Sequence, residues 1–170
     1  IFDILLHFFD HPELAVSTGE MLCACALHEP LASIMLMDER LSLLFSYFTV
    51  SHFDVSTESF AVYKELLTSS PDAEHYIDIH YESVVQKIHS LINEKSYTTC
   101  IQVLQLIGIM IMKYINFQSS YLSSEKNLML MMKLMLSNYR TIAKEAYHIF
   151  KLFVVYEPMT QLVQKLLKKN

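Results

Sequence analysis

The sequence predicts an all-α protein of the armadillo/HEAT-like helical-repeat class, in which short helices stack into a superhelix. Three observations lead to this prediction. First, the 170 residues include only 2 Gly and 4 Pro and no Asn-Gly or Asp-Gly pair, so the usual signals of β-hairpins are missing. Second, 52% of the residues are hydrophobic, which is ample for a buried core. Third, one apolar pattern with helical spacing recurs four times along the chain.

The recurring pattern places apolar or small residues at positions i, i+4, i+7, i+8 and i+11, which lie on one face of an α-helix. The four copies are Ala15, Gly19, Leu22, Cys23, Ala26; Val55, Ser59, Val62, Tyr63, Leu66; Thr99, Val103, Leu106, Ile107, Met110; and Ile142, Ala146, Ile149, Phe150, Phe153. Their starts lie 40, 44 and 43 residues apart. Armadillo and HEAT repeats have this length, and they bury such stripes only by stacking on their neighbours. We therefore expect one domain over residues 1–170, with about four repeats.

The predicted helices are separated by polar or proline-containing breaks. In chain order these are Asp10-His11-Pro12, Glu29-Pro30, Ser69-Ser70-Pro71-Asp72, Ser123-Ser124-Glu125 and Glu157-Pro158. Proline either sets the first turn of a helix or stops the preceding helix. Because each stretch between the breaks is apolar with a helical period, we expect about ten to twelve short helices. The breaks also interrupt any sustained heptad pattern, which argues against a coiled coil.

Charge is distributed unevenly along the chain. The net charge is -5, which argues against nucleic-acid binding because phosphate neutralisation needs a basic face. Residues 1–109 hold 4 Lys or Arg and 15 Asp or Glu, whereas residues 110–170 hold 9 and 3. Such a dipolar chain could steer an acidic partner segment towards its C-terminal end. The alternative is two solvated faces of unlike sign without a binding role.

Residues 127–136 read NLMLMMKLML, with eight Leu or Met in ten positions. A membrane span needs about 20 consecutive apolar residues, and this run is bracketed by Lys126 and interrupted by Lys133, so we expect no membrane segment. Methionine fills core gaps and also lines surfaces that accept a partner's apolar side chains, so the composition leaves both roles open. The three cysteines and the lack of a secretory leader favour reduced thiols in a cytoplasmic protein.

No catalytic or metal-binding motif is complete. The chain has no Walker loop, no G-x-S-x-G, no H-E-x-x-H and no calcium-hand loop. His75 and His80 are five positions apart, which places them about 140° apart around a helix and prevents them from sharing a metal ion. Glu58 and Glu145 occupy equivalent positions of separate repeats, too far apart for paired-carboxylate chemistry. We expect neither enzyme activity nor a metal or cofactor, and a helical metalloenzyme is the least favoured alternative.

Five motifs follow one another in a recognisable order. They are GEMLCACALHEPLASIML (Gly19–Leu36), FDVSTESFAVYKELLT (Phe53–Thr68), INF (Ile115–Phe117), NLMLMMKLM (Asn127–Met135) and RTIAKEAYHIFKLFV (Arg140–Val154). Their order and spacing resemble the C-terminal half of the calcium-binding protein 39 family, the mouse-protein-25 or Mo25 scaffolds, with about one single-residue gap near Ser69 to Asp72. The resemblance covers nearly the whole chain, and it implies that residues 1–170 are the C-terminal part of a longer superhelix.

The resemblance implies a non-catalytic scaffold that clasps a protein kinase or pseudokinase, of the STRAD or sterile-twenty type, and holds it in an active-like conformation. It implies a concave contact face, where Phe53 and Tyr97 match family contact positions. It also implies a C-terminal hydrophobic pocket for a Trp-Glu-Phe-type tail of the partner, where Met132 and Lys168 match pocket residues. Met132 is expected to share its helical face with three neighbours, Leu128, Met131 and Met135. On this interpretation the methionine run is both core and pocket.

The chain departs from the family pattern at positions that matter for binding. Ile101 and Tyr114 stand where the family presents arginines to its pseudokinase, and Met129 replaces a lysine beside the tail pocket. Exchanging arginine for an apolar residue removes bidentate, charge-assisted hydrogen bonds, a loss of about 2 to 5 kcal/mol for each buried pair. Two hypotheses therefore stay open: a kinase scaffold, or a general helical-repeat interaction module that has lost kinase binding. In either case we expect a monomer.

Overall fold

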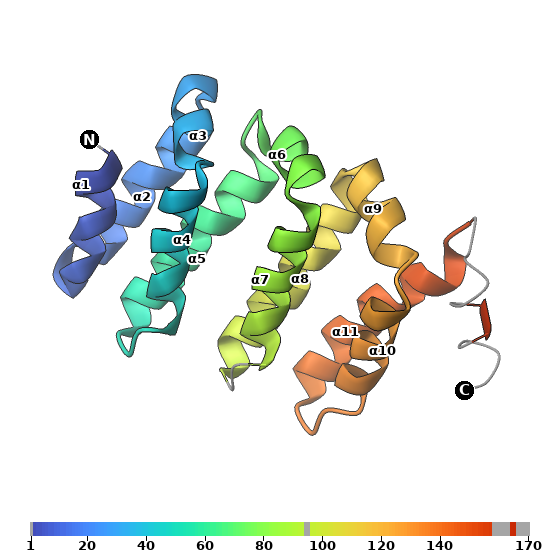
Figure 1. The fold of residues 1–170 in the computed structure, drawn as a ribbon. Helices are drawn as coiled ribbons and strands as arrows, with labels where there is room; N and C mark the ends of the chain where they lie inside the picture. Colours follow the sequence, from blue (N-terminus) through green and yellow to red (C-terminus); the bar gives the residue numbers. More distant parts are fainter. Residues whose placement is uncertain (1, 94–95, 158–163, 166–170) are drawn as a thin grey trace. The chain divides into compact units, whose positions relative to one another are not determined.

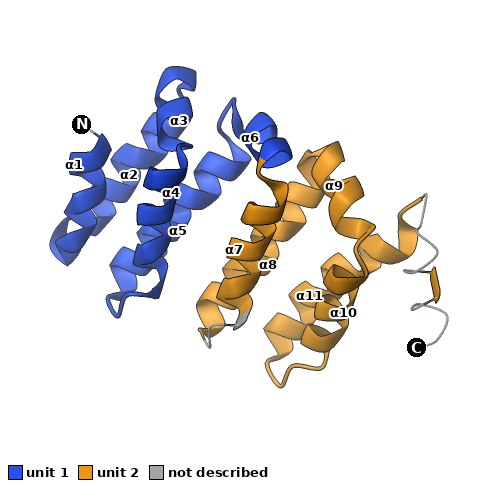
Figure 2. Ribbon diagram, viewed as in Figure 1, with its two compact units in different colours: residues 1–79 blue, residues 80–170 orange. Residues whose placement is uncertain are grey.

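The computed structural model describes residues 2–93, 96–157 and 164–165. Over these residues the chain forms eleven α-helices and three short 3-10 helices and contains no β-strand (Figure 1). The prediction of an all-α fold with ten to twelve short helices is therefore confirmed. The chain divides into two compact units, residues 1–79 and residues 80–170, coloured separately in Figure 2. The expectation of a single domain stays a prediction, and each unit is described by itself.

Unit 1 contains six α-helices. They are α1 (Phe2–His7), α2 (Ala15–Ala26), α3 (Glu29–Met35), α4 (Asp38–Ser46), α5 (Phe53–Thr68) and α6 (Ala73–Ile79), with 3-10 turns at Phe8–Asp10, Pro12–Leu14 and Tyr47–Thr49. α1 packs against α4, and α2 packs against α5. The pair α1 and α2 thus repeats as the pair α4 and α5, with α3 inserted before the second pair, which is the arrangement of a helical repeat.

Unit 2 contains five α-helices. They are α7 (Tyr81–Asn93), α8 (Tyr97–Lys113), α9 (Ile115–Leu122), α10 (Glu125–Met135) and α11 (Arg140–Val155). α7 packs on α8, α10 packs on α11, and α8 packs against α11. The same order of helices as in unit 1 therefore recurs, with α9 as the inserted helix.

Helix starts follow from local sequence. Proline occupies the first turn of α3 at Pro30, where its missing N–H costs no hydrogen bond. The hydroxyl of Ser96 accepts a hydrogen bond from the backbone N–H of Thr99 at the start of α8, and that of Ser124 accepts one from Asn127 at the start of α10. Such caps satisfy amide groups that have no partner inside the helix. The breaks expected near Glu29-Pro30 and Ser123-Ser124 are helix boundaries for these reasons.

The four copies of the apolar pattern lie on α2, α5, α8 and α11. All of their residues are buried except Cys23, Thr99 and Phe150, which are partly buried. The stripe of α2 meets that of α5 within unit 1, and the stripe of α8 meets that of α11 within unit 2. The repeat helices therefore bury their stripes by stacking on their neighbours, as the sequence predicts.

Polar side chains connect neighbouring repeats of unit 1 at nearly constant separation along the chain. The guanidinium of Arg40 bonds to Asp3, and the hydroxyl of Tyr47 donates to Asp10 at 2.9 Å, both across 37 residues. The remaining two contacts join Tyr76 to Asp38 at 3.2 Å across 38 residues and Ser33 to Asp72 across 39. We call these four contacts the repeat ties, because each one joins one repeat to the next.

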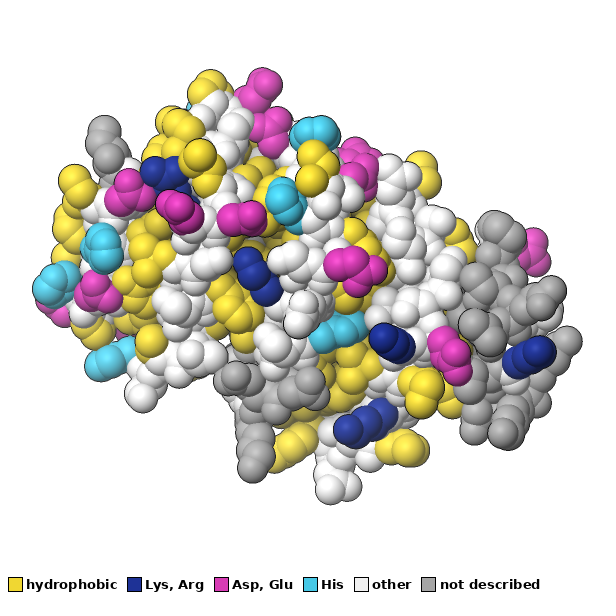
Figure 3. Space-filling view, in the orientation of Figure 1, with side chains coloured by type: hydrophobic (Ala, Val, Ile, Leu, Met, Phe, Trp, Pro, Cys, Tyr) yellow, Lys and Arg dark blue, Asp and Glu magenta, His cyan; other side chains and the backbone are white. Residues whose placement is uncertain are grey.

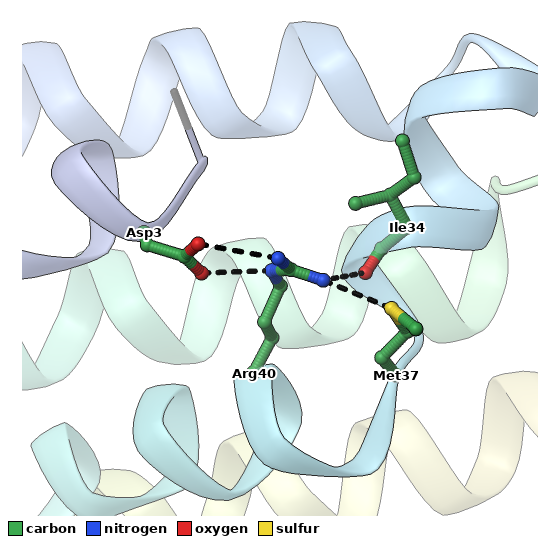
Figure 4. A network of polar contacts seen from close by, with 4 residues as sticks. All are labelled: Asp3, Ile34, Met37 and Arg40. Atoms are coloured by element: carbon green, nitrogen blue, oxygen red, sulfur yellow. Dashed lines mark hydrogen bonds and ion pairs between the residues drawn. The ribbon is translucent and has the colours of Figure 1, made fainter.

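Arg40 makes the most extensive of these contacts (Figure 4). Its Nε lies 2.9 Å from Oδ1 of Asp3 and its Nη2 3.2 Å from Oδ2, while Nη1 donates to the carbonyl oxygen of Ile34 at 3.2 Å and to the sulfur of Met37 at 2.9 Å. The hydrogen bond from Arg40 holds the pKa of Asp3 below its ordinary value. This fork-shaped contact ties α1 to the start of α4.

Aromatic side chains fill the centre of unit 2. The rings of Phe117 and Tyr121 stack with centroids 5.4 Å apart, and Phe153 of α11 lies 6.2 Å from Tyr121. Tyr121 is fully buried, and its hydroxyl lies 3.0 Å from Nε2 of His89 on α7. Because the ring of His89 is partly buried, its pKa is lowered.

No single helix within the described ranges is long and apolar enough to cross a membrane. The helices α8 and α9 meet the length and composition criteria only as a pair, and they are bent by 118° at their junction.

Candidate functional site

The described parts of the chain hold no group of three or more His, Cys, Asp or Glu side chains placed to bind a metal ion. Two of the three thiols are also poor nucleophiles. Burial, reinforced by the carboxylates of Glu65 and Glu58, raises the pKa of Cys23 to about 11, and burial raises that of Cys100. Because the thiolate is the reactive form, these two cysteines do not fit nucleophilic catalysis. The surfaces of the helices are the remaining candidates for function.

Phe53 and Tyr97 occupy the same place in two different repeats. Phe53 is the first residue of α5 and Tyr97 the first residue of α8. Their side chains are 66% and 43% exposed. Large aromatic residues that stay exposed are well suited to binding, because they can bury much surface at low entropic cost. Phe53 belongs to unit 1 and Tyr97 to unit 2, so each is considered within its own unit.

Tyr97 has an aromatic neighbour that the sequence analysis did not single out. The ring of Tyr139, at the start of α11, lies 5.2 Å from the ring of Tyr97 and is itself well exposed. Ile101 follows Tyr97 by one helical turn and is half-buried. The structure therefore brings Tyr97, Ile101 and Tyr139 together where α8 packs against α11.

Tyr114 lies apart from that cluster, between the end of α8 and the start of α9. It is only 4% exposed, and the ammonium of Lys113 lies 5.4 Å from the centre of its ring. A side chain buried to this degree supports the local packing more than it offers a contact surface.

The methionine run of α10 divides between core and surface. Leu128 and Met131 are fully buried, Met132 and Met135 are half-buried, and Met129 is 54% exposed. Met132 therefore belongs to the buried stripe while keeping part of its side chain accessible, as expected of a residue that both packs and binds. Lys168, the other predicted pocket residue, lies outside the described residues.

A groove of about 610 Å³ lies between α7 and the junction of α9 and α10. Its lining includes Tyr81, Glu82, Gln86, Ser124 and Lys126. Burial raises the pKa of Tyr81 to about 12, so its phenol stays protonated. The charges in the groove are mixed in sign, and they do not select one class of ligand.

The two units differ strongly in charge. Unit 1 holds 13 acidic and 2 basic side chains, and residues 80–170 hold 5 and 11. Acidic side chains gather over the helices of unit 1 on the face drawn in Figure 3. Burial, with the carboxylates of Glu20 and Asp54, raises the pKa of Glu58 on α5. The unequal charge expected from the sequence therefore coincides with the division into two units.

Sequence reasoning missed the cations that accompany Tyr139. Arg140 and Lys144 lie on α11 and are exposed. The 43-residue spacing of the last two pattern copies could have found them, because it places Arg140 at the position of Tyr97 and Lys144 at that of Ile101. Neither cation forms an ion pair with another side chain in the part of the chain that the structure describes.

Over the described residues, fold and surface define an all-α helical-repeat protein that presents exposed helix faces for binding. A sequence model of the Mo25-like family matches residues 1–170. The chain therefore belongs to the Mo25-like family. The family resemblance inferred from the five motifs is confirmed.

Individual relatives support the same assignment. The chain is 34% identical over 170 residues to calcium-binding protein 39-like from Mus musculus, covering 98% of this chain and 50% of that protein. It is 30% identical over 173 residues to the Mo25-like protein of Schizosaccharomyces pombe, covering 100% and 53%. An Arabidopsis thaliana MO25-like protein is 35% identical over 176 residues, covering 100% and 50%. The chain thus spans about half the length of the curated relatives it matches.

Proposed function

We propose that the chain is a non-catalytic scaffold or adaptor that binds a protein kinase or pseudokinase and can activate it allosterically. The observation that carries the proposal is the exposure of Phe53 and Tyr97, two large aromatic residues at the first position of successive repeat helices. Each unit of this helical-repeat protein thus presents an exposed aromatic side chain at a helix start, which is suited to contact with a folded protein partner. The protein is further proposed to be monomeric and cytoplasmic.

The proposed second contact is a C-terminal pocket for a partner tail of the Trp-Glu-Phe type, with Met132 in its wall and Lys168 facing the tail glutamate. The partly accessible side chain of Met132 supports this proposal. The pocket is tested by fluorescence polarisation of a labelled acidic peptide ending in Trp-Glu-Phe. Met132→Ala should weaken binding about tenfold, the loss of one well-packed contact. Met112→Ala changes an exposed methionine of α8 and serves as the matched control. Equal affinity of both variants would remove the pocket assignment.

A second candidate function is a general helical-repeat interaction module without kinase binding. Two residues favour this second function. Tyr114 is buried and Ile101 is partly buried. Both are uncharged, whereas the resemblance associates an exposed arginine with each position. Affinity capture from the native cell type, followed by mass spectrometry, separates the two candidates. A set of partners that contains a kinase-fold protein supports the scaffold, and a set without one supports the general module.

A further inference from the structure

One face of α11 carries basic side chains from Arg140 to Lys151. Arg140, Lys144, Tyr147 and Lys151 follow one another at i, i+4, i+7 and i+11 and are all exposed, so they form one stripe of the helix. We call it the α11 basic stripe. It lies opposite the buried stripe of the same helix, which carries Ile142, Ala146, Ile149 and Phe153. The single carboxylate of α11, that of Glu145, is only partly exposed and falls outside the basic stripe.

Aromatic side chains accompany these cations. Tyr139 directly precedes Arg140 and forms the exposed ring pair with Tyr97 where α8 and α11 begin. These two helix starts lie at the lower edge of unit 2 in Figure 2. Further along the stripe, the ammonium of Lys151 lies 5.2 Å from the centre of the ring of Tyr147. Tyrosine and arginine are the residue types most enriched at sites that contribute strongly to protein binding.

The helices α8 and α11 carry the α11 basic stripe and begin at the Tyr97–Tyr139 pair, and their net charge selects the sign of the partner. The helices α8 and α11 together carry Lys113, Arg140, Lys144 and Lys151 against Glu145, a net charge of +3. The equivalent helices of unit 1, α2 and α5, carry Lys64 against Glu20, Asp54, Glu58 and Glu65, a net charge of -3. The repeat helices are therefore not uniformly charged, and the positive charge is confined to one pair of them.

We infer that the α11 basic stripe, together with the Tyr97–Tyr139 pair, binds an acidic segment of a partner protein that also carries apolar side chains. From Arg140 to Lys151 the stripe extends about 16 Å, so a partner helix of three turns can place carboxylates along it. A nucleic acid is the less suitable polyanion, because the whole chain has a net charge of -5 and would repel it. The inference rests on the proposed function in taking the partner to be a protein and in sharing Tyr97 with the proposed contact surface, and it concerns residues outside the Met132 pocket.

The test uses the full chain and a fluorescein-labelled peptide of about 14 residues, long enough to cover the stripe as a helix. The peptide is rich in Glu, with Leu and Phe at every third or fourth position, and its counterpart carries Gln in place of Glu. We expect micromolar binding of the acidic peptide at low salt, weakening towards about 0.15 M salt, and little binding of the Gln peptide. Equal binding of the two peptides would overturn the inference, as would no binding of either.

Two charge-reversal variants locate the site. Arg140→Glu with Lys144→Glu should weaken binding at least fivefold, because each reversal removes an attraction and adds a repulsion. Lys64→Glu with Lys126→Glu makes the same change of net charge at exposed positions on other helices, and it should weaken binding less than twofold. Circular dichroism confirms that both variants fold, and the single variant Lys144→Gln replaces the first if it does not. Equal weakening by both pairs would show an effect of net charge alone and refute the site.

Two further comparisons complete the test. In the first, a single-stranded oligonucleotide and the unlabelled acidic peptide compete with the labelled peptide. If the oligonucleotide displaces it at the lower concentration, the preferred ligand is a nucleic acid and the inference is overturned. Met132→Ala should leave binding of the acidic peptide unchanged. The Met132 pocket and the α11 basic stripe therefore have separate variants and separate probes, so failure of one proposal is distinguishable from failure of the other.

Discussion

Replacing Gly19 with alanine should destabilise unit 1, because α5 leaves no room for a methyl group at this point of α2. A Cβ atom on Gly19 would lie 2.7 Å from Oε2 of Glu58 and 3.0 Å from its Cβ. The carboxylate can rotate away at small cost. The Cβ of Glu58 is fixed to the backbone of α5, so relieving that second contact requires the two helices to separate slightly.

The magnitude follows from two opposing effects. Alanine in a helix interior is more favourable than glycine by about 0.5–1 kcal/mol, whereas overpacking costs about 1–3 kcal/mol. Gly108 on α8 provides the matched control, since a Cβ there would have no heavy atom within 4 Å. Gly108→Ala should therefore raise the free energy of unfolding by about 0.5–1 kcal/mol, and Gly19→Ala should lower it by up to about 2 kcal/mol.

Urea denaturation followed by far-ultraviolet circular dichroism measures both variants. The double variant Gly19→Ala with Glu58→Ala removes the carboxylate contact but keeps the contact between the two Cβ atoms, so it should recover only part of the loss. Changes of the same sign and similar size in the Gly19 and Gly108 variants would refute the argument, because they would show that helix propensity alone decides the outcome at Gly19.

Two further predictions concern the ionisable side chains of Glu58 and Tyr121. Glu58→Gln should raise the urea midpoint at neutral pH, because burial and the carboxylates of Glu20 and Asp54 raise the pKa of Glu58, and the stability linked to a raised carboxyl pKa is lost as the pH rises through it. The advantage should shrink below the ordinary pKa of 4.5, and an advantage that does not change with pH would contradict the assignment. Tyr121→Phe should lower the free energy of unfolding by about 1–3 kcal/mol, because it leaves Nε2 of His89, now 3.0 Å from the phenol oxygen, without this partner; thermal melts that match the wild type would contradict this.

The repeat helices could be predicted because their signal is local and long. Each copy of the pattern has five apolar or small positions over three turns, so burial of nearly all of them on α2, α5, α8 and α11 follows from the sequence. The repeat ties could not be predicted, because Arg40 and Asp3 are 37 residues apart and meet only after the helices pack. The close approach of Glu58 to the place that a Cβ atom on Gly19 would occupy likewise depends on the distance between two helix axes, which no local pattern determines.

The candidate site could be predicted only in part. The resemblance singled out Phe53 and Tyr97, and both are exposed at equivalent helix starts. It also singled out Tyr114, which lies at the junction between α8 and α9 and is buried there. The pairing of Tyr97 with Tyr139 depends on how α8 and α11 are rotated against each other, and helical periodicity in one segment carries no information about the rotation of another.

The four repeat ties of unit 1 span nearly equal lengths of chain, and this should determine how unit 1 unfolds under force. All four contacts close segments of 37 to 39 residues, so none of them reaches beyond the adjacent repeat. Stability in such a chain is a sum of nearest-neighbour terms, and its contacts are local along the sequence. Pulled from its ends, unit 1 should therefore lengthen in steps of one repeat, each step releasing a similar length of chain while the remaining ties still hold.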